Sequence, residues 1–230
     1  MELIKKNIAA VKARIETSMA DAGRDQQSLQ LLAVSKTRDE KYIKSAFSLG
    51  LNAFGENYLQ EALPKIDELK DLPLCWHFIG PIQSNKTISI AEHFDWVHTV
   101  SSLKVAKRLN DQRPESAPPL NVLIQVNIDR EDSKSGVLPE DTDALIDATR
   151  EMGQLNLRGL MVIPKKSKDL DLIRDSFART RLLQESIANR YCLAQFNQLS
   201  MGMSEDLELA IAEGATIIRI GSALFGPRDA

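Results

Sequence analysis

Short apolar runs alternate with amphipathic stretches along almost the whole chain. Residues 2–22 carry apolar side chains at three- and four-residue steps, which predicts one helix ending near Gly23. The later apolar runs are short and bounded by polar residues, glycine or proline, as is typical of buried parallel strands. They predict strands at 29–35, 53–55, 75–79, 95–100, 121–127, 157–163, 196–199 and 216–220.

Each predicted strand leads into a stretch with helical periodicity. These helices are expected at about 39–49, 56–69, 86–93, 102–110, 139–152, 169–190 and 204–213, and Gly221–Gly226 closes the fold. Segment 113–119 holds three prolines and segment 129–136 is polar, so we interpret both as surface loops. Eight strand–helix units predict a single (β/α)8 barrel over residues 1–230, preceded by one extra helix. A doubly wound open sheet is the alternative.

Composition narrows the class of protein without identifying it. The 230 residues are 43% apolar and 27% charged, and the net charge of −3 gives no electrostatic reason to bind nucleic acid or an anionic membrane. Cys75 and Cys192 are far apart and match no metal-binding or redox spacing. With no signal peptide or apolar membrane-spanning stretch, we expect a cytoplasmic protein that contains no metal site.

One lysine stands where a barrel of this kind binds its ligand. Lys36 follows the apolar run 31–34, so it is expected at the carboxyl end of the first strand. A desolvated lysine amine loses its proton more readily and can attack an aldehyde to form a Schiff base. A solvated lysine in a strand-to-helix loop is the competing interpretation.

The loops after the last two strands are candidates for binding an anion. In (β/α)8 barrels, phosphate often binds beside these loops, where glycine lets backbone amides approach and serine adds donors. We assign Ser200, Gly221 and Ser222 to this role, with Gly202 shaping the turn. Ser204 is expected to be a helix cap instead, because two acidic residues follow it.

A charged residue also interrupts the last strand. Arg219 lies between Ile218 and Ile220, where a guanidinium is costly unless it is paired. Either a barrel carboxylate or a bound ligand could supply the partner. The three histidines show no ligand spacing: His77 is expected to line the mouth of the barrel, and His93 and His98 to be structural.

Several motifs together resemble one known family. They are Gly55-Glu56-Asn57, Trp76–Gly80, Gln83–Lys86, Ser200–Ser204 and Arg219–Gly221, with Lys36 ahead of them. The chain resembles, over nearly its whole length, the pyridoxal phosphate homeostasis proteins (the YggS or PROSC family), whose fold is similar to the N-terminal barrel of alanine racemase. It departs slightly, with Ile82 and Met201 where leucine is usual and Ser222 where threonine is common.

The resemblance implies pyridoxal 5′-phosphate (PLP) as the cofactor. By matching position it implies that Lys36 forms the Schiff base and that Ser200, Gly221 and Ser222 hold the phosphate. It also places Arg219 against the pyridine nitrogen. Asn57 and Met201 would pack near the ring.

The function that follows is storage or delivery of PLP by a monomeric cytoplasmic protein that maintains vitamin B6 homeostasis. We expect no catalytic residues, and apo forms of PLP-dependent enzymes as possible recipients. A PLP-dependent amino-acid racemase is the nearest alternative. Such enzymes carry a second domain with a catalytic tyrosine, and we expect none here because the chain ends at Ala230. A Schiff-base aldolase without a cofactor and an interaction scaffold are the remaining alternatives.

Overall fold

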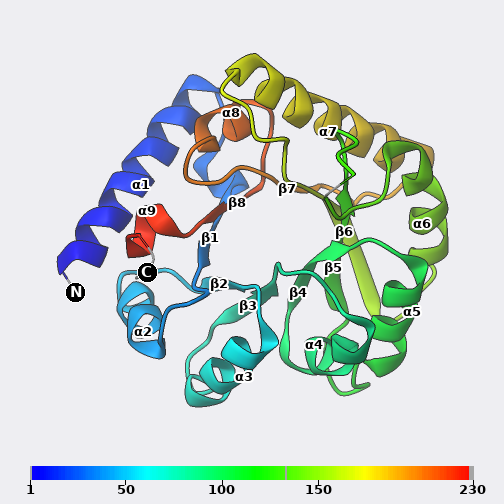
Figure 1. Cartoon of the computed structure of the whole chain (residues 1–230), viewed down its shortest axis with the longest axis horizontal. Helices are drawn as coiled ribbons and strands as arrows, with labels where there is room; N and C mark the ends of the chain where they lie inside the picture. Colours follow the sequence, from blue (N-terminus) through cyan, green and yellow to red (C-terminus); the bar gives the residue numbers. More distant parts are fainter. Residues whose placement is uncertain (1, 133, 228–230) are drawn as a thin grey trace.

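Eight parallel strands close into a barrel in the computed structural model, which describes residues 2–132 and 134–227 (Figure 1). Neighbours in sequence are neighbours in the barrel, and β8 pairs with β1 through the register Gln30↔Ile217 to Ala33↔Ile220. The predicted barrel is confirmed and the open sheet is excluded. The strands are β1 (Gln30–Val34), β2 (Ala53–Glu56), β3 (Cys75–Phe78), β4 (Trp96–Val100), β5 (Leu120–Val126), β6 (Leu155–Val162), β7 (Gln198–Ser200) and β8 (Ile217–Ile220).

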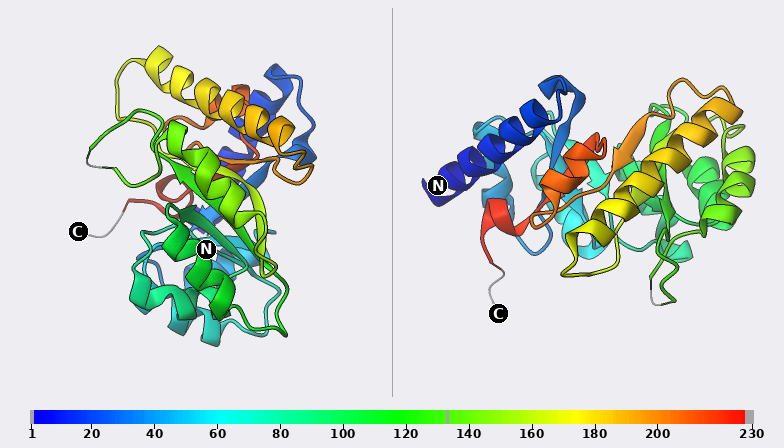
Figure 2. Two further views of the ribbon diagram at one scale, coloured as in Figure 1. Left: turned by 90° about the vertical axis from the view of Figure 1, so that its right-hand side faces the viewer. Right: turned by 90° about the horizontal axis from the view of Figure 1, so that it is seen from above.

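Helices surround the strands as an outer layer (Figures 1 and 2). They are α1 (Glu2–Asp21), α2 (Glu40–Ser48), α3 (Leu59–Glu68), α4 (Thr87–His93), α5 (Leu103–Gln112), α6 (Thr142–Thr149), α7 (Leu170–Arg190), α8 (Leu207–Ala212) and α9 (Ser222–Phe225), with 3-10 turns η1 (Gln26–Ser28), η2 (Ser84–Lys86) and η3 (Pro139–Asp141). The predicted extra helix, α1, lies against α8 and α9 near the seam between β8 and β1. Within the described residues, every helix is too short or too polar to cross a membrane.

Two boundaries differ from the sequence prediction in ways that matter for the site. The helix expected from residue 56 begins at Leu59, because Glu56 ends β2 and is fully buried. The seventh strand lies at Gln198–Ser200 rather than 196–199, so Ser200 closes a strand instead of opening a loop. In the predicted loop 129–136, Ser133 lies outside the described residues.

The interior of the barrel has an apolar layer and a polar one. Since side chains alternate along a strand, every second residue points inward. One buried apolar cluster is made of Leu32, Ala53, Leu123, Met161 and Ile217. The polar layer contains three buried residues, each two positions along the chain from an apolar residue in or against this cluster. They are Arg219 (from Ile217), His77 (from Ile79) and His98 (from Trp96). The large apolar core lies between the barrel and the helices.

The segments after the strands gather at one end of the barrel. In the right-hand view of Figure 2, the loops after β5 and β6 and the segment after β8 project on the same side. This is the end at which the candidate site is expected, because the carboxyl ends of parallel strands meet there.

Candidate functional site

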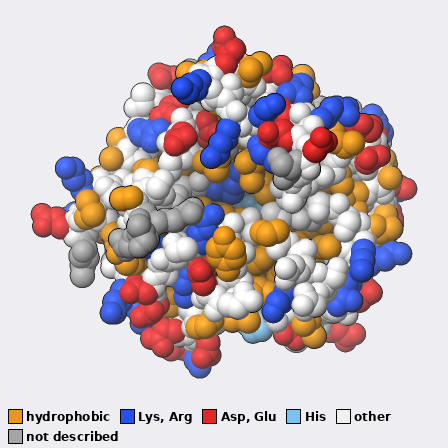
Figure 3. Space-filling model, viewed as in Figure 1, with side chains coloured by type: hydrophobic (Ala, Val, Ile, Leu, Met, Phe, Trp, Pro, Cys, Tyr) orange, Lys and Arg blue, Asp and Glu red, His pale blue; other side chains and the backbone are white. Residues whose placement is uncertain are grey.

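A cavity of about 810 Å³ opens at this end of the barrel. Lysine and arginine side chains gather around a central hollow on the face seen in Figure 3. The lining comes from segments at or after β1, β2, β3, β6, β7 and β8. It includes Lys36, Asn57, Ile79, Met161, Lys165, Ser204, Arg219, Gly221 and Ser222.

The backbone around Lys36 is fixed on both sides. The Ser35 N–H donates to the Gly55 carbonyl at 3.0 Å, which extends the pairing of β1 with β2 beyond Val34. Thr37 then adopts a left-handed backbone with φ +63°, and its N–H donates to the Glu61 carboxylate at 2.8 Å. A β-branched residue in this region costs roughly 1–2 kcal/mol, so neighbouring contacts must hold the turn. The turn directs Lys36 into the cavity, as predicted.

A buried ion pair supports the same segment from outside the barrel. Glu56 accepts hydrogen bonds from the Lys65 ammonium at 2.8 Å and from the Ser35 hydroxyl at 2.6 Å. Lys65 also donates to the Ser35 carbonyl at 3.0 Å. Desolvation raises the pKa of Glu56, and the neighbouring ammonium opposes this rise. The cluster therefore anchors the peptide that precedes Lys36 to α3.

Arg219 brings a positive charge to the floor of the cavity. Its guanidinium donates to the Ser200 hydroxyl at 2.8 Å and to the Val162 carbonyl at 3.0 Å, and the residue is 5% exposed. Burial lowers the pKa of Arg219 to about 10, so it stays charged at neutral pH. Among the described residues it forms no ion pair. The Asp206 carboxylate in the cavity lining attracts the guanidinium through space but is not bonded to it, so the buried guanidinium can still donate to a ligand.

Two serine hydroxyls meet at the rim of the cavity. Ser204 and Ser222 lie with their Oγ atoms 3.4 Å apart, and Gly221 precedes the short helix α9. The prediction that Ser204 caps a helix is wrong, because α8 starts at Leu207 and Asp206 takes the cap position. Gly202 shapes the turn, as expected: its φ is +91°, and an added Cβ would lie 2.5 Å from the Ala210 Cβ. The pair is suited to donate to phosphate oxygens.

The cavity also contains a buried polar atom without a partner. The Asn57 Oδ1 is buried and accepts no hydrogen bond within the described part of the chain. An amine, two hydroxyls, a guanidinium and this amide fit a small phosphorylated aldehyde with a ring acceptor. The donors therefore fit PLP, the cofactor that the resemblance implies.

Two predicted site residues lie away from the cavity. Ser200 and Met201 are fully buried, and neither lines it. A side chain with no accessible surface cannot contact a ligand directly, so in this arrangement the expected phosphate contact of Ser200 and ring contact of Met201 are not available. His77 does not line the mouth either, because it lies deeper inside the barrel and is fully buried. The burial follows from Ser200 being the last residue of β7.

A basic rim was missed by the sequence analysis. Lys165, Lys166 and Lys168 line the cavity from the loop after β6, and all three are exposed. Asp129 fixes this loop by accepting from the Lys165 N–H at 2.7 Å. The three lysines within four residues, directly after a predicted strand, were the available signal. They raise the positive potential at the entrance.

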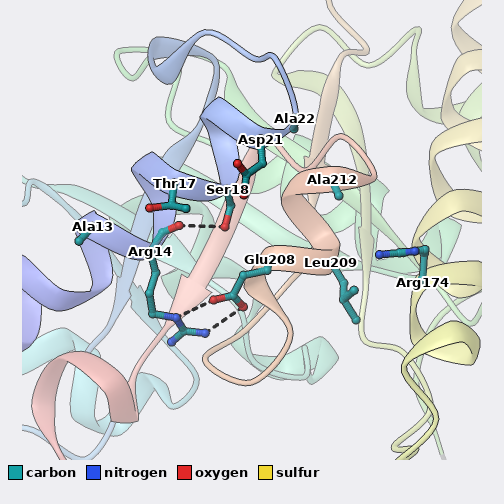
Figure 4. Close-up of a pocket in the computed structure, with 10 residues that line it drawn as sticks. All are labelled: Ala13, Arg14, Thr17, Ser18, Asp21, Ala22, Arg174, Glu208, Leu209 and Ala212. Atoms are coloured by element: carbon teal, nitrogen blue, oxygen red, sulfur yellow. Dashed lines mark hydrogen bonds and ion pairs between the residues drawn. The ribbon is translucent and has the colours of Figure 1, made fainter.

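A second hollow, of about 540 Å³, lies in the helical layer between α1 and α8, with Arg174 of α7 beside it (Figure 4). Arg14 and Glu208 form a two-pronged ion pair there, with N–O distances of 2.7 and 2.9 Å. Its other residues are mostly small, and its charged pair is already satisfied. We assign no chemistry to it.

Comparisons with known proteins agree with this geometry. Residues 4–229 match the family described as alanine racemase, N-terminal domain. A pyridoxal phosphate homeostasis protein of Pseudomonas aeruginosa is 54% identical over 231 residues, covering 100% of this chain and 97% of the relative. The corresponding protein of Escherichia coli K12 is 45% identical, covering 100% and 98%.

Solved structures give the same assignment. The structure of PipY from Synechococcus elongatus with PLP bound has a TM-score of 0.85 and 36% identity, covering 97% of this chain and 100% of that one. Alanine racemase of Corynebacterium glutamicum shares the fold, with a TM-score of 0.69 but 18% identity, and the match spans 62% of its chain. The chain is thus a member of the alanine racemase N-terminal domain family and, within it, of the pyridoxal phosphate homeostasis proteins.

Proposed function

We propose that this protein binds PLP reversibly at Lys36 and so stores or delivers the cofactor. The observation that carries the proposal is the convergence of three groups on one cavity: Lys36, the Ser204–Ser222 hydroxyl pair, and the buried guanidinium of Arg219. The bound state of PipY, a relative of the same fold and length, supports it.

Each group has a separate task in the proposal. Lys36 supplies the amine; the cofactor, when bound, supplies an aldehyde that forms a Schiff base which another amine can displace. Ser204, Ser222 and the backbone of Gly221 hold the phosphate. Arg219 donates toward the pyridine nitrogen, and Asn57 packs beside the ring. Phosphate contacts provide affinity, and the lysine provides covalent but reversible retention.

Storage suits the site better than turnover of amino acids. A ring nitrogen facing an arginine stays unprotonated, because guanidinium keeps its own proton near neutral pH, and the ring is then a poor electron acceptor. Racemisation needs a base on each face of the substrate. Besides Lys36, the basic side chains in the described lining are arginines and exposed lysines, and no tyrosine lines it. The similar solved racemases show the shared fold alone.

We further propose that the protein acts as a monomer in the cytoplasm and that apo enzymes receive its cofactor. The basic rim of Lys165, Lys166 and Lys168 supports capture of the free, anionic cofactor, because it raises the local concentration of anions at the entrance.

Borohydride reduction of the PLP-loaded protein tests the site. Reduction makes the lysine linkage permanent, and peptide mass mapping should place the phosphopyridoxyl mass on the peptide with Lys36. Lys36→Ala should lose the visible absorbance band but keep weakened PLP binding, because the phosphate contacts remain. Lys165→Ala, also in the lining, is the matched control and should keep the band.

Three outcomes would contradict the proposal. Label on Lys86 or Lys134 would move the covalent site elsewhere. Complete loss of affinity in Lys36→Ala would mean that the phosphate contacts are wrongly placed. Failure to load PLP together with trapping of a ketose phosphate at Lys36 would favour an aldolase.

A further inference from the structure

A line of hydrogen bonds runs inside the barrel from the cavity toward its opposite end. The Arg219 guanidinium donates to the Ser200 hydroxyl at 2.8 Å, and Ser200 Oγ lies 2.8 Å from His98 Nδ1. His98 Nε2 is 2.9 Å from His77 Nδ1, and His77 Nε2 is 3.3 Å from the Cys75 sulfur. Five side chains from β8, β7, β4 and β3 thus form one continuous path.

The path lies in the closed interior, sealed from solvent. Ser200, His98 and His77 have no exposed surface. The ring of His77 stacks on Trp96, with centroids 5.4 Å apart and planes inclined by 5°. Cys75, at the amino end of β3, is the partly exposed terminus. Polar groups buried this deeply lower the stability of the fold unless each one is hydrogen-bonded. The path is complete, so the fold depends on each of its bonds.

One assignment of protons satisfies every member. Arginine can only donate, so Ser200 accepts from it and uses its own proton for His98 Nδ1. Neutral His98 then carries its proton on Nε2 and donates to His77 Nδ1. His77 likewise carries its proton on Nε2 and donates to the Cys75 sulfur. Each bond therefore points away from Arg219, because the reverse direction would leave the Ser200 O–H without an acceptor among the described residues.

The surroundings keep both histidines neutral. Burial lowers the pKa of His77 to about 3 and that of His98 well below its usual value, and the Arg219 charge adds to the effect on His98. At the far end, desolvation and the nearby Asp95 raise the pKa of the Cys75 thiol to about 12. Arg158 lies over the Trp96 ring, 5.5 Å from its centroid. The groups facing the path are therefore a thiol, aromatic rings, the cations of Arg219 and Arg158, and the Asp95 carboxylate beside Cys75.

We propose that Ser200, His98 and His77 form a positioning chain that holds the Arg219 guanidinium as a hydrogen-bond donor toward the cavity. Two of its five N–H groups are used on Ser200 and on the Val162 carbonyl. With these fixed, the planar guanidinium has one orientation, and its remaining N–H groups serve the ligand. Ser200 then acts on the cofactor through Arg219, in place of a direct bond to phosphate. The inference rests on the proposed PLP function for its ligand, but the chain itself does not.

Histidine tautomers test the chain without any cofactor. Long-range ¹H–¹⁵N spectra of the protein free of PLP should show His77 and His98 both protonated on Nε2 and neutral between about pH 5.5 and 8. A proton on His98 Nδ1, or titration of either ring in this range, would overturn the chain. Because no ligand is present, this result is independent of whether the protein binds PLP.

Ser200→Ala tests the link to the cofactor. Loss of the bridging hydroxyl frees Arg219 to turn, so PLP binding should weaken about tenfold. The absorbance maximum and the ¹⁵N shift of the pyridine nitrogen should move as well. Ser200→Thr keeps the hydroxyl and should restore both signals. Thr87→Val is the matched control, since Thr87 is a buried hydroxyl that also accepts from an arginine, Arg108, at 3.0 Å outside the cavity lining.

The outcomes are distinct. Weaker binding with an unchanged absorbance maximum and pyridine shift would return Ser200 to the phosphate and overturn the chain's role. Equal behaviour of Ser200→Ala and Thr87→Val would overturn it too. If wild-type protein binds no PLP, the proposed function fails, while the tautomer spectra still decide whether the chain exists.

Discussion

Two buried cations in this barrel differ in what neutralises them. Lys65, on α3 outside the barrel, is 8% exposed and forms an ion pair with Glu56. Arg219, on β8 inside it, is 5% exposed and has a hydroxyl and a carbonyl as its partners. The first charge has a carboxylate bonded to it, whereas the second has only the Asp206 carboxylate acting on it through space.

The difference separates a scaffold contact from a ligand site. A buried ion pair keeps its geometry without help, and Lys65 holds the peptide before Lys36 in place. A buried guanidinium without a bonded carboxylate has N–H groups left for a ligand acceptor, such as the proposed pyridine nitrogen. Arg219 is thus the better marker of function, although both residues are equally buried.

Breaking the Lys65–Glu56 ion pair should have the largest effect, which is a loss of stability. Lys65→Met leaves the Glu56 carboxylate buried without its ammonium, and the free energy of unfolding should fall by about 3–5 kcal/mol. Urea titration of the variant measures the loss. Lys65→Met combined with Glu56→Gln should recover much of it, and a loss below about 1 kcal/mol in the single variant would show that the pair is not needed.

Acid should destabilise the folded protein, because His77 and His98 are buried in their neutral form beside Arg219. An unfolded histidine binds a proton near pH 6.5, whereas folded His77 does so near pH 3. The unfolded state therefore binds more protons as the pH falls, and stability present above about pH 6.5 is lost below it. The slope is up to about 1.4 kcal/mol per pH unit for each histidine.

Unfolding by urea at several values between about pH 7 and pH 5 measures this slope. Replacing one ring, as in His77→Gln, should reduce it by about half. A stability that does not change over this range would mean that the rings take up protons in the folded state.

Removing the Arg219 charge should change stability little. Arg219→Leu removes a buried cation that has no bonded carboxylate, but it also removes the hydrogen bonds to Ser200 and Val162. Because these two effects oppose each other, the free energy of unfolding without PLP should change by less than about 1 kcal/mol. PLP affinity should fall at the same time. A loss of stability as large as that of Lys65→Met would break the comparison, since Arg219 would then be a scaffold residue too.

The smallest expected effect is the rate at which the PLP-loaded protein exchanges the α-hydrogen of free amino acids. If Arg219 donates to the ring nitrogen, as proposed, the loaded protein should exchange the α-hydrogen of alanine, serine or glutamate in D₂O no faster than about the rate of free PLP. NMR of the amino acid after incubation with concentrated protein gives the rate. Exchange faster by several orders of magnitude would restore the racemase alternative.

The fold could be predicted because its signals are local. The apolar runs are separated by one helix each, and a parallel strand after each helix is forced by chain length and handedness. The errors lie at boundaries where a side chain makes a tertiary contact. Glu56 extends β2 because Lys65 neutralises it, and no pattern near residue 56 reports this partner.

The site was predictable only in part. Lys36 stands out because it follows an apolar run, and Arg219 stands out because it interrupts one. The role of Ser200 depends on His98 and Arg219, which come from two other strands, and this contact is invisible in a local window. The alternation of Cys75 with His77, and of Trp96 with His98, was a usable signal, because it places these side chains on one face of their strands.

The pairing of β8 with β1 has a consequence for how the protein is made. Lys36 follows β1, the first strand of the barrel, and Arg219 lies on β8, the last. A nascent chain can present the amine early, but it lacks the proposed guanidinium and Gly221–Ser222 segment until β8 and α9 have been made. An interrupted or truncated product would therefore retain little cofactor. On the proposed site, only chains that include β8 would load PLP, and shorter fragments would leave the pool of free PLP untouched.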